Sequence, residues 1–126
     1  MEENNNVIDF IKNKFNHTLI IDDDECYQDL VKMYALNFSK EVTICNSVEK
    51  AEKLLETSKF DLILTDYFIP NRKFGSDIVK NNNIKTILMS GDLEYIKNND
   101  YNVFKIEHFI EKPINPKELY SIINKI

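Results

Sequence analysis

Several features that often reveal the class of a protein are scarce in this sequence. It has no tryptophan, two glycines and a single arginine, and its longest unbroken apolar run is four residues, Met33 to Leu36. A transmembrane helix needs about 20 apolar residues in succession, so none is expected. Three asparagines and two lysines stand near the N-terminus, where a secretory signal needs an apolar core. The sequence therefore predicts a cytoplasmic protein that does not bind a membrane.

The few cysteines and histidines form no disulfide or metal-binding pattern. Cys26 and Cys45 fit neither a disulfide framework nor a zinc cluster. His17 and His108 have no second histidine or cysteine at ligand spacing. The chain carries 16 basic and 21 acidic residues, a formal net charge of -5, and its lysines are scattered. This charge pattern argues against direct binding of nucleic acid.

Strand-like and helix-like segments alternate along the chain. Short β-branched and aliphatic runs predict five strands, at Thr18–Ile21, Glu41–Cys45, Asp61–Thr65, Ile84–Met89 and Glu107–Ile110. Apolar residues at helical spacing and capping residues predict helices at Glu25–Leu36, after Ser47, at Ser76–Asn82, at Asp92–Asn98 and after Asn115. Strands that alternate with helices form a parallel sheet covered on both faces. The predicted fold class is therefore α/β.

The length of 126 residues, 43% of them hydrophobic, allows one domain with a buried core. We assign residues 18–126 to this domain and residues 1–17 to an N-terminal extension. Within the extension, residues 7–15 have apolar side chains at helical spacing and predict a short amphipathic helix. Because so short a helix is marginal alone, it is expected either to dock on another part of the structure or to fray.

Polar side chains follow four of the five predicted strands. Asp22 and Asp23 come after the first strand and Asp66 after the third. Ser90 follows the fourth strand and Lys112 the fifth. The functional groups of an open parallel sheet gather outside the carboxyl ends of its strands, so these five side chains are expected to lie together. Asp24, the next acid along, is expected only to cap the following helix.

This set of side chains predicts metal and phosphate chemistry. Three neighbouring carboxylates repel one another unless a cation neutralises them, and oxygen ligands near a phosphate favour Mg²⁺. Lys112 offers a positive charge to an anion, and the Ser90 hydroxyl can donate to an oxygen. Asp66 follows the most central strand, where a carboxylate could act as a nucleophile on phosphorus.

The same residues carry a family resemblance. The matching segments are Leu19–Asp23, Asp61–Asp66 with Pro70 four residues on, Ser90–Gly91 and Lys112–Pro113. In order and spacing they resemble the receiver domain of bacterial two-component response regulators, of the single-domain chemotaxis-response type. The resemblance covers residues 18–126 and implies a flavodoxin-like, doubly wound (βα)5 fold.

The resemblance implies a role for each acidic residue. Asp66 would accept a phosphoryl group from a histidine kinase, a histidine phosphotransferase or a small phosphodonor. Mg²⁺ would be bound directly by Asp23, by Asp66 and by the backbone carbonyl of Phe68. Asp22 would reach the ion through water. The domain would promote its own phosphorylation and dephosphorylation and would not act as an enzyme on other substrates.

It also implies how the signal leaves the site. Ser90 and Lys112 would contact the phosphoryl oxygens, and the Lys112–Pro113 peptide bond would be cis. Movement of Ser90 toward the phosphate would free space for Phe109, which would switch the surface that binds a downstream effector protein. The interval from Asp66 to Ser90 is 24 residues. This is a turn or two shorter than usual, so the third helix is expected to be shortened.

Two other functions remain open from the sequence. The shortened third helix would also suit a receiver-like interaction domain that works without phosphorylation. A small Mg²⁺-dependent phosphatase could use an aspartate nucleophile as well. The haloacid-dehalogenase type needs a second acid two residues after the nucleophile, and Phe68 stands there. The sequence therefore disfavours the phosphatase.

Overall fold

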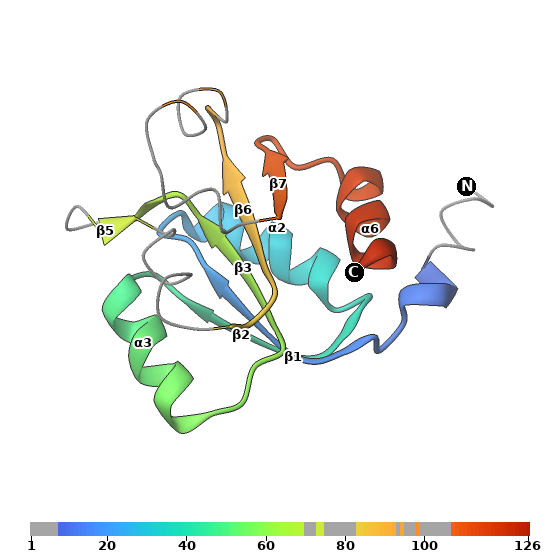
Figure 1. Ribbon diagram of the computed structural model, residues 1–126, viewed down its shortest axis with the longest axis horizontal. Helices are drawn as coiled ribbons and strands as arrows, with labels where there is room; N and C mark the ends of the chain where they lie inside the picture. The colour runs from blue at the N-terminus through green and yellow to red at the C-terminus, as the bar shows by residue number, and fades with distance from the viewer. Residues whose placement is uncertain (1–7, 70–72, 75–82, 93, 95–97, 99–106) are drawn as a thin grey trace.

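A central sheet of five parallel strands organises the molecule (Figure 1). The computed structural model describes residues 8–69, 73–74, 83–92, 94, 98 and 107–126. The strands are β1 (Phe15–Ile21), β2 (Ser39–Cys45), β3 (Leu62–Asp66), β4 (Phe68–Ile69), β5 (Lys73–Phe74), β6 (Thr86–Ser90) and β7 (His108–Glu111). The helices are α2 (Glu25–Ala35), α3 (Val48–Thr57) and α6 (Pro116–Lys125). Across the described part of the chain, no helix is long and apolar enough to cross a membrane.

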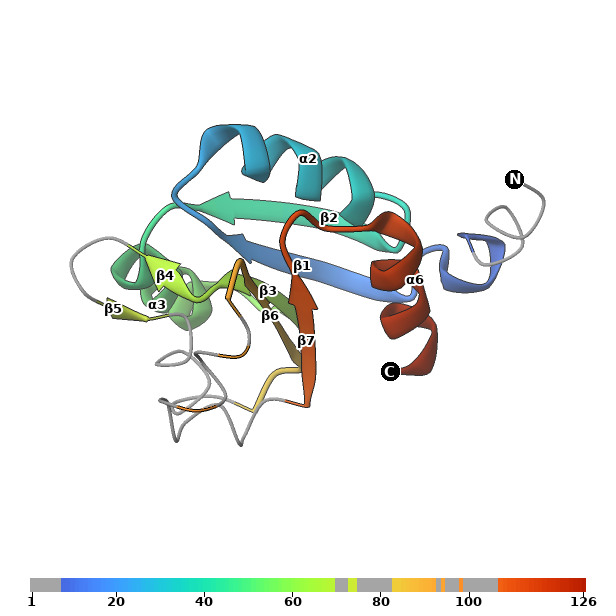
Figure 2. The same ribbon diagram turned by 90° about the horizontal axis from the view of Figure 1, so that it is seen from above.

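The strand order of the sheet is β2-β1-β3-β6-β7. The first strand therefore lies inside the sheet, and the chain winds to one side of it and then to the other, as in flavodoxin-like folds. Helices α2 and α6 cover one face of the sheet, and α3 covers the opposite face (Figures 1 and 2). The predicted α/β fold, with helices on both faces of a parallel sheet, is confirmed.

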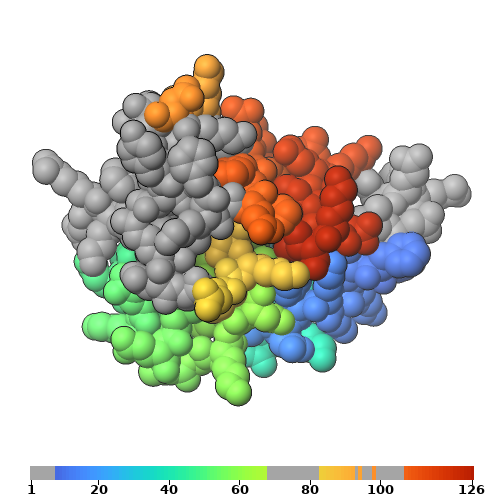
Figure 3. All heavy atoms as spheres, viewed as in Figure 1, coloured from blue at the N-terminus to red at the C-terminus, as the bar shows by residue number. Residues whose placement is uncertain are grey.

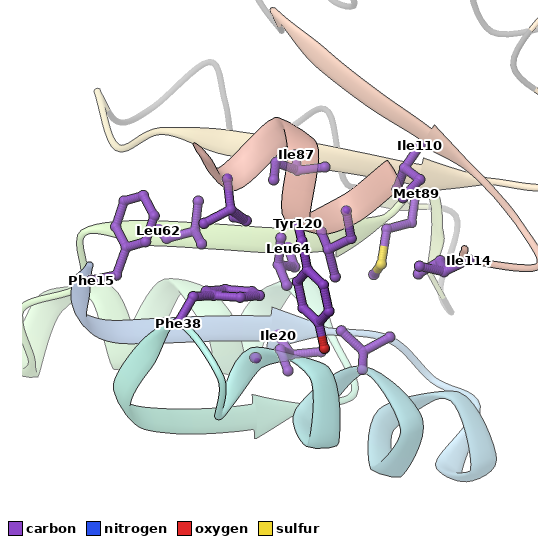
Figure 4. Close-up of a cluster of buried hydrophobic side chains, with 14 of the residues drawn as sticks. Phe15, Ile20, Phe38, Leu62, Leu64, Ile87, Met89, Ile110, Ile114 and Tyr120 are labelled. Carbon is purple, nitrogen blue, oxygen red and sulfur yellow. The ribbon is translucent and has the colours of Figure 1, made fainter. Parts of the chain in front are cut away.

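Side chains that alternate along β1 supply the two halves of the core. Ile20 packs on the side of α2 and α6, whereas Leu19 and Ile21 pack on the side of α3. Burying one such side chain contributes about 1.5–3 kcal/mol. Figure 4 shows the larger cluster, which contains Ile11, Phe15, Ile20, Val31, Ala35, Phe38, Leu62, Leu64, Ile87, Met89, Ile110, Ile114, Leu119, Tyr120 and Ile123.

The helix predicted for residues 7–15 is shorter than expected. Only residues 8–11 of this segment are helical among those described. Asn13 has φ 56°, a left-handed conformation that asparagine tolerates better than most residues. This residue ends the helical turn and redirects the chain into β1.

β1 begins at Phe15, three residues before the predicted start at Thr18. The backbone N–H of Phe15 donates to Phe38 O at 2.9 Å, and the Phe15 side chain is buried in the core. Ile11 is fully buried in the same cluster. Of the two expected alternatives, docking and fraying, the structure shows docking for Ile11 and Phe15. The other strands of the main sheet begin and end within two residues of their predicted limits.

Two lysines, one in the N-terminal segment and one directly before β6, donate hydrogen bonds to the C-terminal end of α6. Lys14 Nζ donates to Ile123 O at 2.7 Å, and Lys85 Nζ donates to Ile126 O at 2.8 Å. Ile123 lies in the last turn of α6 and Ile126 is its C-cap, so neither carbonyl has a partner within the helix. In Figure 3 the blue N-terminal residues accordingly border the red residues of α6.

The helix starts follow the sequence closely. Asp24, Ser47 and Asn115 are the N-caps of α2, α3 and α6, and each side chain accepts a hydrogen bond from a backbone N–H of the first turn. Pro116 occupies the first turn of α6, where its missing N–H costs nothing. Each such cap contributes about 1 kcal/mol.

A short antiparallel pair, β4 with β5, was not predicted from the sequence. Phe68 pairs with Phe74 in it. The helix predicted for Ser76–Asn82, including its shortening, lies outside the described residues. Most of the helix predicted for Asp92–Asn98 lies outside them as well.

Candidate functional site

The predicted site residues do meet at the carboxyl edge of the sheet. Asp22 directly follows β1, and Asp66 is the last residue of β3. Ser90 is the last residue of β6, and Lys112 directly follows β7. The strands are parallel and in register, with Asp66 opposite Met89 and Ser90 opposite Glu111, so their ends reach the same edge.

Three carboxylates form the centre of the site. Asp22, Asp23 and Asp66 each present an oxygen, and these oxygens lie within 4.8 Å of one another. Asp22 is fully buried, Asp66 is half-buried and Asp23 is exposed. Three negative charges at this separation repel one another, so the cluster favours a bound cation.

Both oxygens of the Asp22 carboxylate already accept a hydrogen bond. Oδ1 accepts the backbone N–H of Asp24 at 3.0 Å, and Oδ2 accepts Lys112 Nζ at 2.8 Å. A buried carboxylate needs such partners because it has lost its water. Asp22 is thus held in place, while Asp23 faces solvent.

Lys112 joins the acids to the end of β6. Its ammonium lies 3.5 Å from Asp66 Oδ2, and its backbone N–H donates to Ser90 O at 2.8 Å. Burial alone would lower the pKa of this lysine, but its hydrogen bond to Asp22 and the charges of Asp66 and Asp22 outweigh burial and raise the pKa. Lys112 is therefore a permanent positive charge in the site. Its peptide bond to Pro113 is cis, as the resemblance implied.

The pKa of the Asp66 carboxyl group is strongly raised. Burial raises its pKa from the ordinary 3.8 to about 6, and the neighbouring charges of Asp22 and Asp23 push in the same direction. Lys112 opposes this rise through its charge and a hydrogen bond. Strongly shifted groups in a charged cluster are typical of functional sites.

The remaining predicted residues surround this cluster. Ser90 is buried, and its Oγ accepts the backbone N–H of Asp92 at 3.0 Å. Phe109 lies half-buried on β7, opposite Leu88 of β6. Phe68 is the first residue of β4, two residues beyond Asp66. The switch role of Phe109 and the metal role of the Phe68 carbonyl stay predictions.

One contact of the site was missed from the sequence. The Lys112 ammonium lies 4.2 Å from the centroid of the Tyr27 ring. Tyr27 is in the first turn of α2, four residues before the buried Val31 and so on the same helical face. The sequence signal for this contact was weak: a tyrosine, aromatic with a polar hydroxyl, on the buried face of the helix about one turn after Asp22 and Asp23.

A cleft of about 520 Å³ opens beside Asp23. It lies between the start of α2, the end of β2 and the first half of α3, and Lys50 and Lys53 of α3 line it. Asp23 is exposed and lines this cleft, so the acidic cluster borders the cleft through Asp23.

Several solved structures with the same fold come from response regulators. The signal receiver domain of a DNA binding response regulator from Colwellia psychrerythraea is 26% identical, with a TM-score of 0.74 over 87% of this chain and 96% of that one. The chemotaxis response regulator CheY4 of Vibrio cholerae has the same TM-score of 0.74 at 18% identity, over 87% of this chain and 97% of that one. At 18% identity the second likeness shows the fold alone.

Sequence comparison points to the same family. Transcription factor SKN7 of Candida albicans is 25% identical over 119 residues, which cover 86% of this chain and 20% of that protein. The chain thus spans about a fifth of the length of this curated relative. The response regulator receiver domain family matches residues 18–124, which include all of the predicted site residues. The chain therefore belongs to the response regulator receiver domain family.

Proposed function

We propose that this receiver domain accepts a phosphoryl group on Asp66 from a histidine kinase or a histidine phosphotransferase, in a Mg²⁺-dependent reaction that switches the binding of an effector protein. Membership of the family supports phosphoacceptor signalling in general. The observation that carries the specific proposal is the position of Lys112, 2.8 Å from Asp22 Oδ2 and 3.5 Å from Asp66 Oδ2. A nucleophile, a compensating cation and two further acids thus share one edge of the sheet.

Asp66 would act as the nucleophile. One of its carboxylate oxygens attacks phosphorus while the bond from phosphorus to the donor histidine nitrogen breaks, and the imidazole keeps the electron pair and takes up a proton. A pKa of about 6 leaves the carboxylate mostly ionised at neutral pH and more basic than an ordinary aspartate. The product is an acyl phosphate that water can hydrolyse.

The acidic cluster fits Mg²⁺ by its chemistry and its spacing. The three oxygens within 4.8 Å of one another are hard donors, which Mg²⁺ prefers. Asp23 and Asp66 would hold the ion directly, together with the Phe68 carbonyl. Both oxygens of Asp22 already accept hydrogen bonds, which favours contact through water. The bound ion would neutralise charge on the acids and on the phosphoryl oxygens.

Lys112 and Ser90 would receive the phosphoryl oxygens. Lys112 supplies a positive charge that is present before the phosphoryl group arrives, so little reorganisation is needed. The Ser90 hydroxyl accepts the N–H of Asp92, and it can donate its own hydrogen to a phosphoryl oxygen at the same time. Leu88 lies two residues before Ser90 on β6 and pairs with Phe109 on β7. Through this pairing a shift of Ser90 would reach Phe109 and the surface that binds the effector protein.

Phosphorylation by acetyl phosphate tests this proposal. With Mg²⁺ present, the wild type should gain the mass of one phosphoryl group, and Asp66→Asn should gain none. Asp61→Asn is the matched control, because this aspartate flanks the same strand at its other end and should leave labelling intact. Absence of labelling in the wild type, together with no response to beryllofluoride, would overturn the proposal and favour an interaction domain that works without phosphorylation.

A further inference from the structure

Tyr27 makes two contacts with the segment that carries Lys112. Its ring centroid is 4.2 Å from Lys112 Nζ, and its Oη accepts the backbone N–H of Ile114 at 3.3 Å. One side chain of α2 thus contacts the residues on both sides of Pro113. From these contacts we propose that Tyr27 is a positioning residue that holds the Lys112 ammonium at the phosphoryl site, an inference that rests on the proposed function.

The ring contact complements the acidic contacts of Lys112. The ammonium of a lysine stands on a flexible stem of four carbons, so its charge alone does not fix where the ammonium lies. A divalent cation would share the negative charge of Asp22 and Asp66, so these acids would attract the ammonium less strongly when the cation is bound. The face of an aromatic ring attracts a cation through its quadrupole, which does not depend on the charge of the acids. Tyr27 therefore keeps the ammonium in place when the cluster is neutralised.

The hydroxyl contact acts on the backbone of the same segment. Pro113 has no N–H, so the first N–H available after Lys112 is that of Ile114. Ile114 is buried beside Met89 and Ile110 (Figure 4), and its N–H needs a partner there. Tyr27 supplies that partner and links α2 to the segment between β7 and α6.

Tyr27 itself is well anchored. It lies in the first turn of α2, and its backbone N–H donates to the N-cap Asp24 at 3.3 Å. Its half-buried ring packs against the large core cluster. The backbone N–H of Asp24 also donates to Asp22. Asp24 therefore contacts both Asp22 and Tyr27, the two residues that contact the Lys112 ammonium from this side.

Two substitutions separate the two contacts. Tyr27→Phe keeps the ring and loses the oxygen, whereas Tyr27→Leu loses both. We expect Tyr27→Leu to weaken beryllofluoride binding at saturating Mg²⁺ by about fivefold to tenfold, the range of a partly desolvated cation–π contact. Tyr27→Phe should stay within about twofold of the wild type, and the affinity for Mg²⁺ alone should change less than about twofold in both variants. A loss confined to the phosphoryl analogue identifies positioning of Lys112.

An NMR measurement on the metal-free protein reports the contact directly. The methylene protons next to Lys112 Nζ should show an upfield ring-current shift in the wild type and in Tyr27→Phe, and the shift should vanish in Tyr27→Leu. Tyr34→Leu is the matched control, because Tyr34 is on the same helix but contacts Tyr120, with ring centroids 6.4 Å apart. This control should lose stability without losing beryllofluoride affinity or the shift.

Three outcomes would overturn the inference: unchanged beryllofluoride affinity in Tyr27→Leu, an equal loss of affinity for Mg²⁺ and beryllofluoride, or an absent ring-current shift in the wild type. If Tyr27→Leu does not fold, Tyr27→Met removes the ring and replaces it with a flexible, unbranched side chain that adapts to irregular core space. If the wild type binds no beryllofluoride, the proposed function fails, and the ring-current shift alone decides whether Tyr27 positions Lys112.

Discussion

The two ends of β3 use the same residue type in opposite ways. Asp61 stands before the strand, and its carboxylate accepts the backbone N–H groups of Asn16 and His17 at 2.8 and 2.9 Å. Asp66 stands at the other end, where its carboxylate faces Asp22 and Lys112. Asp61 meets neutral backbone donors that are fixed in place, and Asp66 meets charged side chains.

The difference shows that partners, not residue type, decide what an aspartate does. The two N–H donors stabilise the Asp61 carboxylate and join β3 to the start of β1. At the other end, burial and like charges raise the pKa of Asp66 to about 6, so its carboxylate is poorly stabilised without a further cation. One end of the strand is therefore structural, and the other end is available for chemistry.

Removing the lysine should have the largest effect. Lys112→Met leaves the fully buried Asp22 carboxylate without its ion-pair partner. We expect the free energy of unfolding in the absence of Mg²⁺ to fall by about 3–5 kcal/mol, the cost of breaking a buried pair. Phosphorylation by acetyl phosphate should slow by about a hundredfold, since a preorganised positive charge is lost. Urea unfolding and mass spectrometry of the labelled protein measure the two effects.

Lys117→Met is the control for this variant. Lys117 is exposed on α6, so its loss should change neither the stability nor the labelling appreciably. If Lys112→Met were labelled at the wild-type rate, Lys112 would have no part in phosphoryl transfer.

Substitution at the structural end should lower stability and leave labelling unchanged. Asp61→Ala removes the acceptor of two backbone N–H groups, and each lost bond to a charged group costs about 1.5–3 kcal/mol, reduced here because water reaches this half-buried site. We expect a net loss of stability of about 2 kcal/mol with labelling of Asp66 unchanged. Asp61→Asn, which keeps one acceptor oxygen, should lose about half as much. A large loss of labelling in a folded Asp61→Ala protein would contradict the division between the two ends.

The smallest expected effect is on Mg²⁺ binding as the pH falls. Asp66 is protonated below a pKa of about 6, and a protonated carboxyl is a poor metal ligand. Lowering the pH from about 7 to about 5 should therefore weaken Mg²⁺ binding by about tenfold, which calorimetry can measure. Binding that is independent of pH in this range would mean that Asp66 is not a ligand.

Stability without Mg²⁺ should move in the opposite direction. The pKa of Asp66 is higher in the folded protein than in the unfolded chain, so the favourable contribution of this group is present below the ordinary pKa of 3.8 and is lost as the pH rises through about 6. The difference in unfolding free energy between the wild type and Asp66→Asn should follow this curve. A difference that is constant between about pH 4 and about pH 7 would contradict the raised pKa.

Much of the fold follows from local sequence patterns. The caps Asp24, Ser47 and Asn115 were predicted from residue type and position, and all three accept the expected N–H groups. A cap acts only on its own first turn, so the information lies within a few residues. Short β-branched runs likewise place the strands within a few residues of their limits.

The convergence of the acids and the lysine was also predictable, because strands that alternate with helices along the chain form a parallel sheet. Once the strands are parallel, residues that follow Ile21, Thr65 and Glu111 must reach the same edge. The start of β1 was not predictable in this way. Phe15 joins the strand because its N–H meets Phe38 O and its ring finds a core to fill, and both depend on residues more than 20 positions away.

The sequence by itself thus determined which groups stand at the carboxyl edge: three acids, a serine and a lysine, in the order of the receiver domain family. Tertiary structure decided how these groups act on one another. Lys112 contacts Asp22 at 2.8 Å and lies beside the Tyr27 ring, and both contacts join distant parts of the chain. The pKa of about 6 at Asp66 likewise depends on residues that are distant in the sequence. Charge, burial and ring contacts depend on distances in space. Those distances are set by the packing of α2 on the sheet and by the pairing of β7 at its edge.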